Sequence, residues 1–110
     1  MICDLGDIVV VPFPFVDVTA EKRRPSIVLS HSAFNESNRH SVCAMITSAV
    51  RSQWAGDIAI SDLAAAGLRH PCIIRWKVFT LPNESILKRL GNLGAPDRVT
   101  LIEAAKKILM

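Results

Sequence analysis

Three basic residues stand together between two apolar runs near the start of the chain. The first run covers residues 8–15, the basic stretch with its proline covers residues 22–25, and the second run covers residues 27–29. Because a strand follows directly, the backbone can hold the side chain of Arg24 still, and a planar guanidinium matches two oxygens of a phosphate. The pattern therefore predicts an anion site suited to phosphate. A solvated basic turn between two strands is the alternative.

A second pair of cations stands inside a later apolar run, at residues 72–79. Side chains alternate along a strand, so Arg75 and Lys77 would project together from one face. Trp76 would lie on the opposite, apolar face, in the core or in a dimer interface. A strand at a solvated sheet edge would show the same pattern, and this alternative also stays open.

Length and composition favour one domain, residues 1–110, with a mildly basic surface. Half of the residues are hydrophobic, the formal net charge is +3 and the pI is near 9.0. The positive charge favours an anionic partner without establishing one. A domain this small has much surface for its volume, so the apolar excess suggests a second buried surface, as in a dimer.

The cysteines and the N-terminus point to a cytoplasmic location. Cys3, Cys43 and Cys72 are odd in number and lack CxxC spacing, so we expect reduced thiols, mostly in the core. The histidines show no metal-ligand spacing either, and we expect neither a metal nor another cofactor. The first residues are unlike a signal peptide, and no apolar stretch approaches the roughly 20 residues that span a bilayer. We therefore expect a soluble protein without a membrane segment.

Hydrophobic periodicity and turn residues predict short strands followed by helices. The expected strands cover residues 8–13, 26–30, 42–48, 57–60 and 72–79, and the expected loops cover residues 31–40 and 49–56. One or two helical turns at 61–67 would begin at Ser61 as N-cap and end at Gly67. Further helices are expected at 84–90 and at 96–109, where Pro96 suits the first turn. The fold class is mainly β with α: a small, partly open barrel with a C-terminal helix.

A series of short motifs runs through most of the chain in a fixed order. They are Gly6-Asp7-Ile8-Val9, Pro12-Phe13-Pro14-Phe15, Arg24-Pro25 before Ser26-Ile27-Val28-Leu29-Ser30, Ala44-Met45-Ile46-Thr47-Ser48, Ala66-Gly67-Leu68, Ile73-Ile74-Arg75, Phe79-Thr80-Leu81 and Leu87-Lys88-Arg89-Leu90-Gly91. The ordered set resembles the MazF/PemK family of toxins from bacterial toxin–antitoxin modules. The resemblance implies an SH3-like barrel of the CcdB/MazF type and a homodimer. It also implies a metal-independent, sequence-specific endoribonuclease that acts on single-stranded RNA, inhibited by a cognate antitoxin.

The resemblance also places functional residues on this sequence. It implies Arg24 and Thr47 as catalytic residues, with Arg75 as a third. Family members often have an aspartate, a candidate acid/base, where this chain has Lys77, so Glu21 is the nearest candidate for the general base. We expect RNA contacts from the loops at 16–22 and 49–56 and from nearby strand ends. The residues are Lys22, Arg23, Ser48, Gln53, Trp54 and Lys77.

The chemistry implied is attack of the RNA 2′-hydroxyl on the adjacent phosphate, which leaves a 2′,3′-cyclic phosphate and a 5′-hydroxyl end. Arg24 would stabilise the developing charge, Thr47 would fix a phosphate oxygen, and Arg75 would be a second clamp. Trp54 would stack on an unpaired base, or cover the barrel end instead. Two other functions stay open: a CcdB-like poison that binds gyrase without nuclease activity, and a degenerate member that binds RNA or antitoxin but does not cut.

Overall fold

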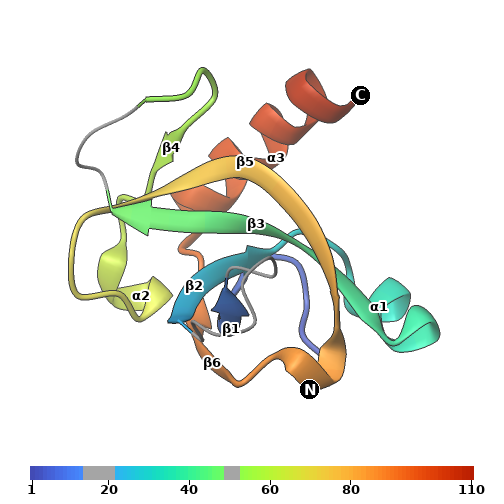
Figure 1. The fold of residues 1–110 in the computed structure, drawn as a ribbon. Helices are drawn as coiled ribbons and strands as arrows, with labels where there is room; N and C mark the ends of the chain where they lie inside the picture. Colours follow the sequence, from blue (N-terminus) through green and yellow to red (C-terminus); the bar gives the residue numbers. More distant parts are fainter. Residues whose placement is uncertain (14–21, 49–52) are drawn as a thin grey trace.

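The computed structural model describes residues 1–13, 22–48 and 53–110. Within these residues the chain forms one curled antiparallel sheet of six strands in the order β4-β5-β3-β2-β1-β6 (Figure 1). The elements are β1 (Asp7–Phe13), β2 (Lys22–Val28), α1 (Ser32–Asn38), β3 (His40–Ser48), β4 (Ile58–Ala59), α2 (Leu63–Ala66), β5 (Cys72–Pro82), the 3₁₀ turn η1 (Asn83–Ser85), β6 (Lys88–Asn92) and α3 (Ala95–Leu109). The expected small barrel with a C-terminal helix is confirmed.

The main core lies on one face of this sheet. Paired residues of neighbouring strands share a face, and Ile27, Ala44, Ile46 and Ile74 all point to the same side. Leu101 of α3 packs into this cluster and is 1% exposed. The helix therefore covers the sheet as its periodicity predicts, beginning one residue before Pro96. No helix in the described residues combines the length and the apolar character needed to cross a membrane.

Part of the opposite face of the sheet is also buried. Val9, Val11, Val28, Cys43 and Leu81 form a second buried cluster there. Figure 1 shows β3 and β5 running across the molecule, with α1 at one end and β4 at the other. The second cluster occupies the part of this face near α1. The part of the same face toward β4 carries the polar side chains described below.

The segment predicted as a surface loop, residues 31–40, contains the helix α1 (Ser32–Asn38). The prediction of a loop was wrong. The segment is polar and lacks the apolar stripe that indicates a helix, but one of its polar residues is buried and anchors the helix. Asn35 is fully buried, and its side-chain amide donates to the backbone oxygens of Cys3 and Ser30. Tertiary hydrogen bonds thus fix a helix that local propensity does not favour.

The segment predicted as a short helix, residues 84–90, forms the turn η1 and the strand β6 instead. The edge of β1 opposite β2 needs a partner, and Asp7–Val10 pair with Lys88–Asn92. Sheet pairing over such a separation overrides the helical pattern of the segment. The start of α2 also differs: its N-cap is Asp62, whose carboxylate accepts from the Ala65 N–H, although Gly67 ends the helix as predicted.

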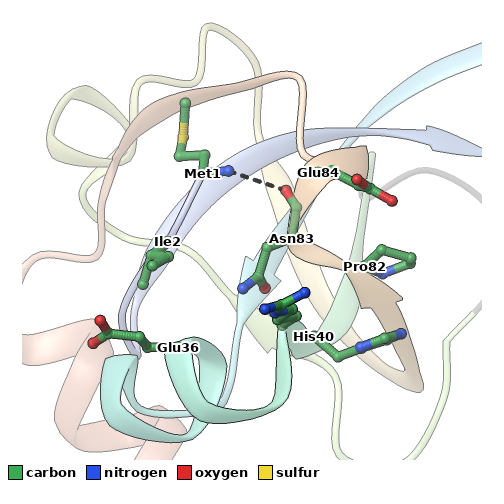
Figure 2. A pocket seen from close by; sticks show the side chains of 8 residues that line it. Met1, Ile2, Glu36, His40, Pro82, Asn83 and Glu84 are labelled. Atoms are coloured by element: carbon green, nitrogen blue, oxygen red, sulfur yellow. Dashed lines mark hydrogen bonds between the residues drawn. The ribbon is translucent and has the colours of Figure 1, made fainter.

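A buried polar network fastens the N-terminus and α1 to the end of β5. The Asn83 side chain donates to the backbone oxygen of Asn35 at 2.7 Å and accepts from the Ser41 hydroxyl at 2.6 Å. The terminal amine of Met1 donates to the backbone oxygen of Asn83 at 3.3 Å, as Figure 2 shows. These hydrogen bonds give the buried polar groups of the network their partners and hold the N-terminus, α1 and the end of β5 together.

Candidate active site

Three of the residues predicted to be catalytic lie on one face of adjacent strands. Ser26 of β2 pairs with Met45 of β3, which pairs with Arg75 of β5, so these three side chains share a face. Thr47 stands two residues along β3 and Arg24 two residues back along β2, and both therefore share it too. The register of β2 and β3, continued by two residues, sets Arg24 opposite Thr47. The sheet thus gathers residues that lie 23 and 28 positions apart in the sequence.

Arg24 has an unmet hydrogen-bond donor. The residue is half-buried, and among the described residues its buried Nε has no partner. A buried donor without a partner typically costs about 1–3 kcal/mol. An anionic oxygen at this position would remove that cost. Lys22 and Arg23, which precede it in β2, are exposed and add positive charge at the same strand end.

Arg75 is not on a solvated edge, because β5 lies between β3 and β4. The residue is 9% exposed and forms a bidentate ion pair with Asp57. Nη2 donates to Oδ2 at 2.9 Å and Nε donates to Oδ1 at 3.2 Å. This geometry holds the guanidinium in one orientation on the face that carries Thr47.

Trp54 stands beside both cations of β5. The guanidinium of Arg75 lies 5.4 Å from the centroid of its ring, and Nζ of Lys77 lies 5.6 Å from the same ring. Both distances are within the range of cation–π attraction. The predicted alternation along β5 is confirmed, since Arg75 and Lys77 reach one ring while Trp76 packs against the main core.

The sequence did not single out Asp57 as a site residue. It directly precedes β4, and only the pairing of Ile58 with Ile74 brings it to Arg75. The hydrogen bond from Arg75 lowers the pKa of Asp57 below its ordinary value of 3.8; partial burial opposes this shift, and the Trp54 N–H supports it. Asp57 in turn raises the pKa of Arg75. Asp57 is therefore ionised at neutral pH and is a weak proton acceptor.

The remaining predicted residues divide into placed and unplaced ones. Thr47 is half-buried at the end of β3, while Ser48, Gln53 and Lys77 are exposed. Glu21 lies outside the described residues, as do residues 16–20 and 49–52 of the two loops predicted to contact RNA. Within the residues that the structure describes, no group of three His, Cys, Asp or Glu side chains is arranged to hold a metal ion.

A pocket of about 520 Å³ lies at the far end of β3 and β5 (Figure 2). His40 pairs with Pro82 at that end, whereas Thr47 pairs with Ile73 at the other. The lining mixes acids with cations and exposed apolar side chains: Met1, Ile2, Glu36, Arg39, His40, Pro82, Asn83 and Glu84. This hollow is thus separate from the face that carries Arg24 and lacks a uniform positive charge.

Comparison with known proteins agrees with this fold. A family model described as PemK-like, MazF-like toxin of type II toxin-antitoxin system matches residues 4–109. A search of curated proteins finds no match. Among solved structures, the MazE-MazF complex from Deinococcus radiodurans matches with a TM-score of 0.76 at 18% identity, covering 100% of this chain and 99% of that one.

Two mycobacterial structures are similar to the same degree. The Mycobacterium tuberculosis toxin MazF-mt6 matches with a TM-score of 0.72 at 22% identity, over 92% of this chain and 93% of that one. An endoribonuclease in complex with its cognate antitoxin, from a mycobacterial species, matches with a TM-score of 0.75 at 16% identity, over 97% and 94%. These structures support the fold, and the family model spans nearly the whole sequence. The chain belongs to the PemK-like, MazF-like toxins of type II toxin–antitoxin systems.

Proposed function

We propose that this toxin is a metal-independent, sequence-specific endoribonuclease that cuts single-stranded RNA. The observation that carries the proposal is the shared face of Arg24, Thr47 and Arg75, with an Arg24 Nε on it that has no partner among the described residues. Two guanidinium groups and a hydroxyl on one face of the sheet suit a phosphodiester. A CcdB-like gyrase binder would need no such arrangement, and this favours the nuclease.

In the proposed reaction the 2′-hydroxyl of the RNA attacks the adjacent phosphorus. The general base takes the 2′ proton, the bond from phosphorus to the 5′-oxygen of the next nucleotide breaks, and that oxygen gains a proton, leaving a 2′,3′-cyclic phosphate and a 5′-hydroxyl. Arg24 stabilises the negative charge that develops on the phosphoryl oxygens. Thr47 fixes one of these oxygens by its hydroxyl or backbone N–H, and Arg75 is a second clamp. DNA lacks the attacking hydroxyl, so the reaction is specific for RNA.

The general base is the part of this mechanism with the fewest candidates. Asp57 is excluded from this role because both of its carboxylate oxygens accept hydrogen bonds from Arg75. Glu21 keeps the role in the proposal, with Lys77 as the other group close to Arg75. Loss of a general base typically slows a reaction by about 10²–10⁴-fold. The cleavage rate of Glu21→Gln should therefore be lower than that of the wild type by about 10²–10⁴-fold.

Base recognition is assigned to the side chains around Trp54, which is 43% exposed. Stacking of an unpaired base on such a ring is typically worth about 1–3 kcal/mol. Lys77 lies beside the ring, and exposed side chains at the neighbouring strand ends would contact the RNA backbone. These are Lys22, Arg23, Ser48 and Gln53.

The proposed partners are a second copy of the chain and a cognate antitoxin, all in the cytoplasm. Apolar side chains of α3 remain uncovered in the single chain, with Val99 62% and Leu109 56% exposed. Burial of such side chains is a usual driving force for homodimers. Two of the similar structures are complexes with MazE or a cognate antitoxin, which supports an antitoxin partner here. Sedimentation of the purified protein would test the dimer.

The decisive experiment is cleavage of a defined RNA in EDTA, with mapping of both new ends. Wild-type protein should leave 5′-hydroxyl and 2′,3′-cyclic phosphate ends. Arg24→Ala should reduce the rate by about 10²–10³-fold, the loss typical of one oxyanion donor. Arg23→Ala, an adjacent exposed arginine, is the matched control and should weaken RNA binding more than catalysis.

Three results would contradict the proposal. Unchanged cleavage by folded Arg24→Ala protein would remove the central residue of the mechanism. A folded wild-type protein that binds RNA or antitoxin but cuts no RNA would support the degenerate member, and inhibition of gyrase supercoiling would support the CcdB-like function.

A further inference from the structure

Asp57 joins two parts of the candidate site through one carboxylate. Its Oδ1 and Oδ2 accept from Nε and Nη2 of Arg75, and Oδ2 also accepts from the backbone N–H of Trp54 at 2.9 Å. An arginine side chain has many rotamers, and a bidentate carboxylate removes most of that freedom. The same group thus fixes a side chain of β5 and the start of the turn before β4.

The turn itself is closed and fastened to β5. The Asp57 N–H donates to the Trp54 oxygen at 3.1 Å, and Gly56 has a φ of +92°, which favours glycine at this position. The indole N–H of Trp76 donates to the Gly56 oxygen at 3.0 Å. The position of the Trp54 ring beside Arg75 and Lys77 therefore depends on hydrogen bonds at both ends of the turn.

We propose that Asp57 is a positioning residue that holds the Arg75 guanidinium and the Trp54 ring as one unit. Through this unit the phosphate clamp and the base-stacking surface keep a fixed mutual distance, so that a base on Trp54 aligns its phosphate with Arg24 and Thr47. The inference rests on the proposed nuclease function. Asp57 acts through its two neighbours and does not exchange a proton with RNA.

The test compares Asp57→Asn with Glu84→Gln, which removes the same charge from an exposed residue at the other end of β5. Asparagine has one acceptor oxygen, which the Arg75 guanidinium and the Trp54 N–H must share, and its NH2 group cannot accept from the second Arg75 donor, so both contacts are weakened. We expect kcat for RNA cleavage to fall by about 10²-fold, the loss typical of a misplacement near 1 Å, whereas Glu84→Gln stays at the wild-type rate. The pH profile of kcat should keep its shape, because Asp57 does not exchange a proton with RNA. Loss of a general base would instead remove the rise of kcat with pH on the acidic side of the profile.

Coupling to Arg75 gives a second measurement. If Asp57 acts through Arg75, the double variant Asp57→Asn/Arg75→Ala should cleave no more slowly than Arg75→Ala alone. A further independent loss of 10-fold or more in the double variant would overturn the positioning role. So would equal rates for Asp57→Asn and Glu84→Gln.

The third measurement needs no RNA and separates this inference from the nuclease proposal. Acrylamide quenching of tryptophan fluorescence is recorded for each protein with and without Trp54→Phe, and the difference gives the signal of Trp54. Asp57→Asn should raise the quenching constant of Trp54, and Glu84→Gln should not. If wild-type protein cuts no RNA, the proposed function fails, while unchanged quenching in Asp57→Asn overturns the present inference whatever the cleavage result.

A variant that keeps the turn guards against misfolding. Asp57→Ser retains a side-chain acceptor for the Trp54 N–H, as serine does in similar turns, but loses the bidentate contact. We expect it to be folded by circular dichroism and to lose kcat as Asp57→Asn does. Wild-type kcat in folded Asp57→Ser would contradict the role assigned to the Arg75 contact.

Discussion

Removal of the Asp97 carboxylate should destabilise the fold. Asp97 lies in the first turn of α3, is 4% exposed, and accepts from the Ser61 N–H, the Ser61 hydroxyl and the Asp62 N–H at 2.7–3.0 Å. These bonds attach the turn between β4 and α2 to the start of α3. Asp97 thus connects two segments whose contacting residues lie 35 and 36 positions apart in the sequence.

The size of the effect follows from these contacts. A hydrogen bond to a charged group contributes about 1.5–3 kcal/mol, and the positive end of the helix adds a few tenths to about 1 kcal/mol. Water can reach the exposed Ser61 and Asp62 after the substitution, which offsets part of the loss. Asp97→Ala should therefore lower the free energy of unfolding by about 2–4 kcal/mol. For a domain of this size, that loss corresponds to a Tm lower by roughly 10–20 °C.

Urea unfolding followed by circular dichroism measures this difference directly. Glu103→Ala is the matched control, since Glu103 is an exposed acid of the same helix, and it should change stability by less than about 0.5 kcal/mol. A loss in Asp97→Ala no larger than in Glu103→Ala would refute the reasoning that the carboxylate joins the two segments.

The pH dependence gives an independent check on Asp97. Burial raises its pKa, but the hydrogen bonds from Asp62 and Ser61 outweigh burial, and the pKa lies below the ordinary value of 3.8. The stabilisation is therefore complete above that value and is lost as the pH falls through the folded-state pKa. The stability difference between wild type and Asp97→Asn should stay constant from pH 7 to pH 5 and shrink below 3.8.

Three further outcomes are expected. Gly91→Ala should lower the unfolding free energy by about 3 kcal/mol or more in thermal or urea melts, because a Cβ would lie 2.4 Å from the backbone oxygen of Ala65. Asn83→Ala should cost about 2–4 kcal/mol by stranding its two buried partners, and a loss below 1 kcal/mol would contradict the network. Burial raises the pKa of Cys43 to about 12, so mass spectrometry after brief alkylation of native protein should find Cys72 modified and Cys43 protected until urea is added.

Much of the fold could be predicted because its signals are local. The apolar runs gave β1, β3 and β5, alternation placed Arg75 and Lys77 on one face of β5, and the periodicity of residues 96–109 gave α3. These features depend on neighbours within a few residues, which the sequence displays. The ordered motifs also indicated the toxin family, and the family model confirms it.

Long-range pairing decided the elements that were predicted wrongly. Residues 88–92 form a strand because they pair with the edge of β1. The local sequence pattern of these residues is helical and does not indicate this distant partner. Residues 32–38 form a helix because the buried Asn35 side chain donates to the backbone oxygen of Cys3, 32 positions away. In both cases the stabilising contact lies outside the window in which propensity acts.

For the candidate site, the sequence by itself determined the types of the groups: an arginine at a strand start, a threonine near a strand end and a cation inside a strand. The tertiary structure decided which groups meet. Asp57 precedes Arg75 by 18 residues, and only the pairing of β4 with β5 closes that gap to hydrogen-bonding distance. Sheet pairing selects contacts by register and not by residue type, and for this reason the carboxylate at the site could be found only in the folded chain.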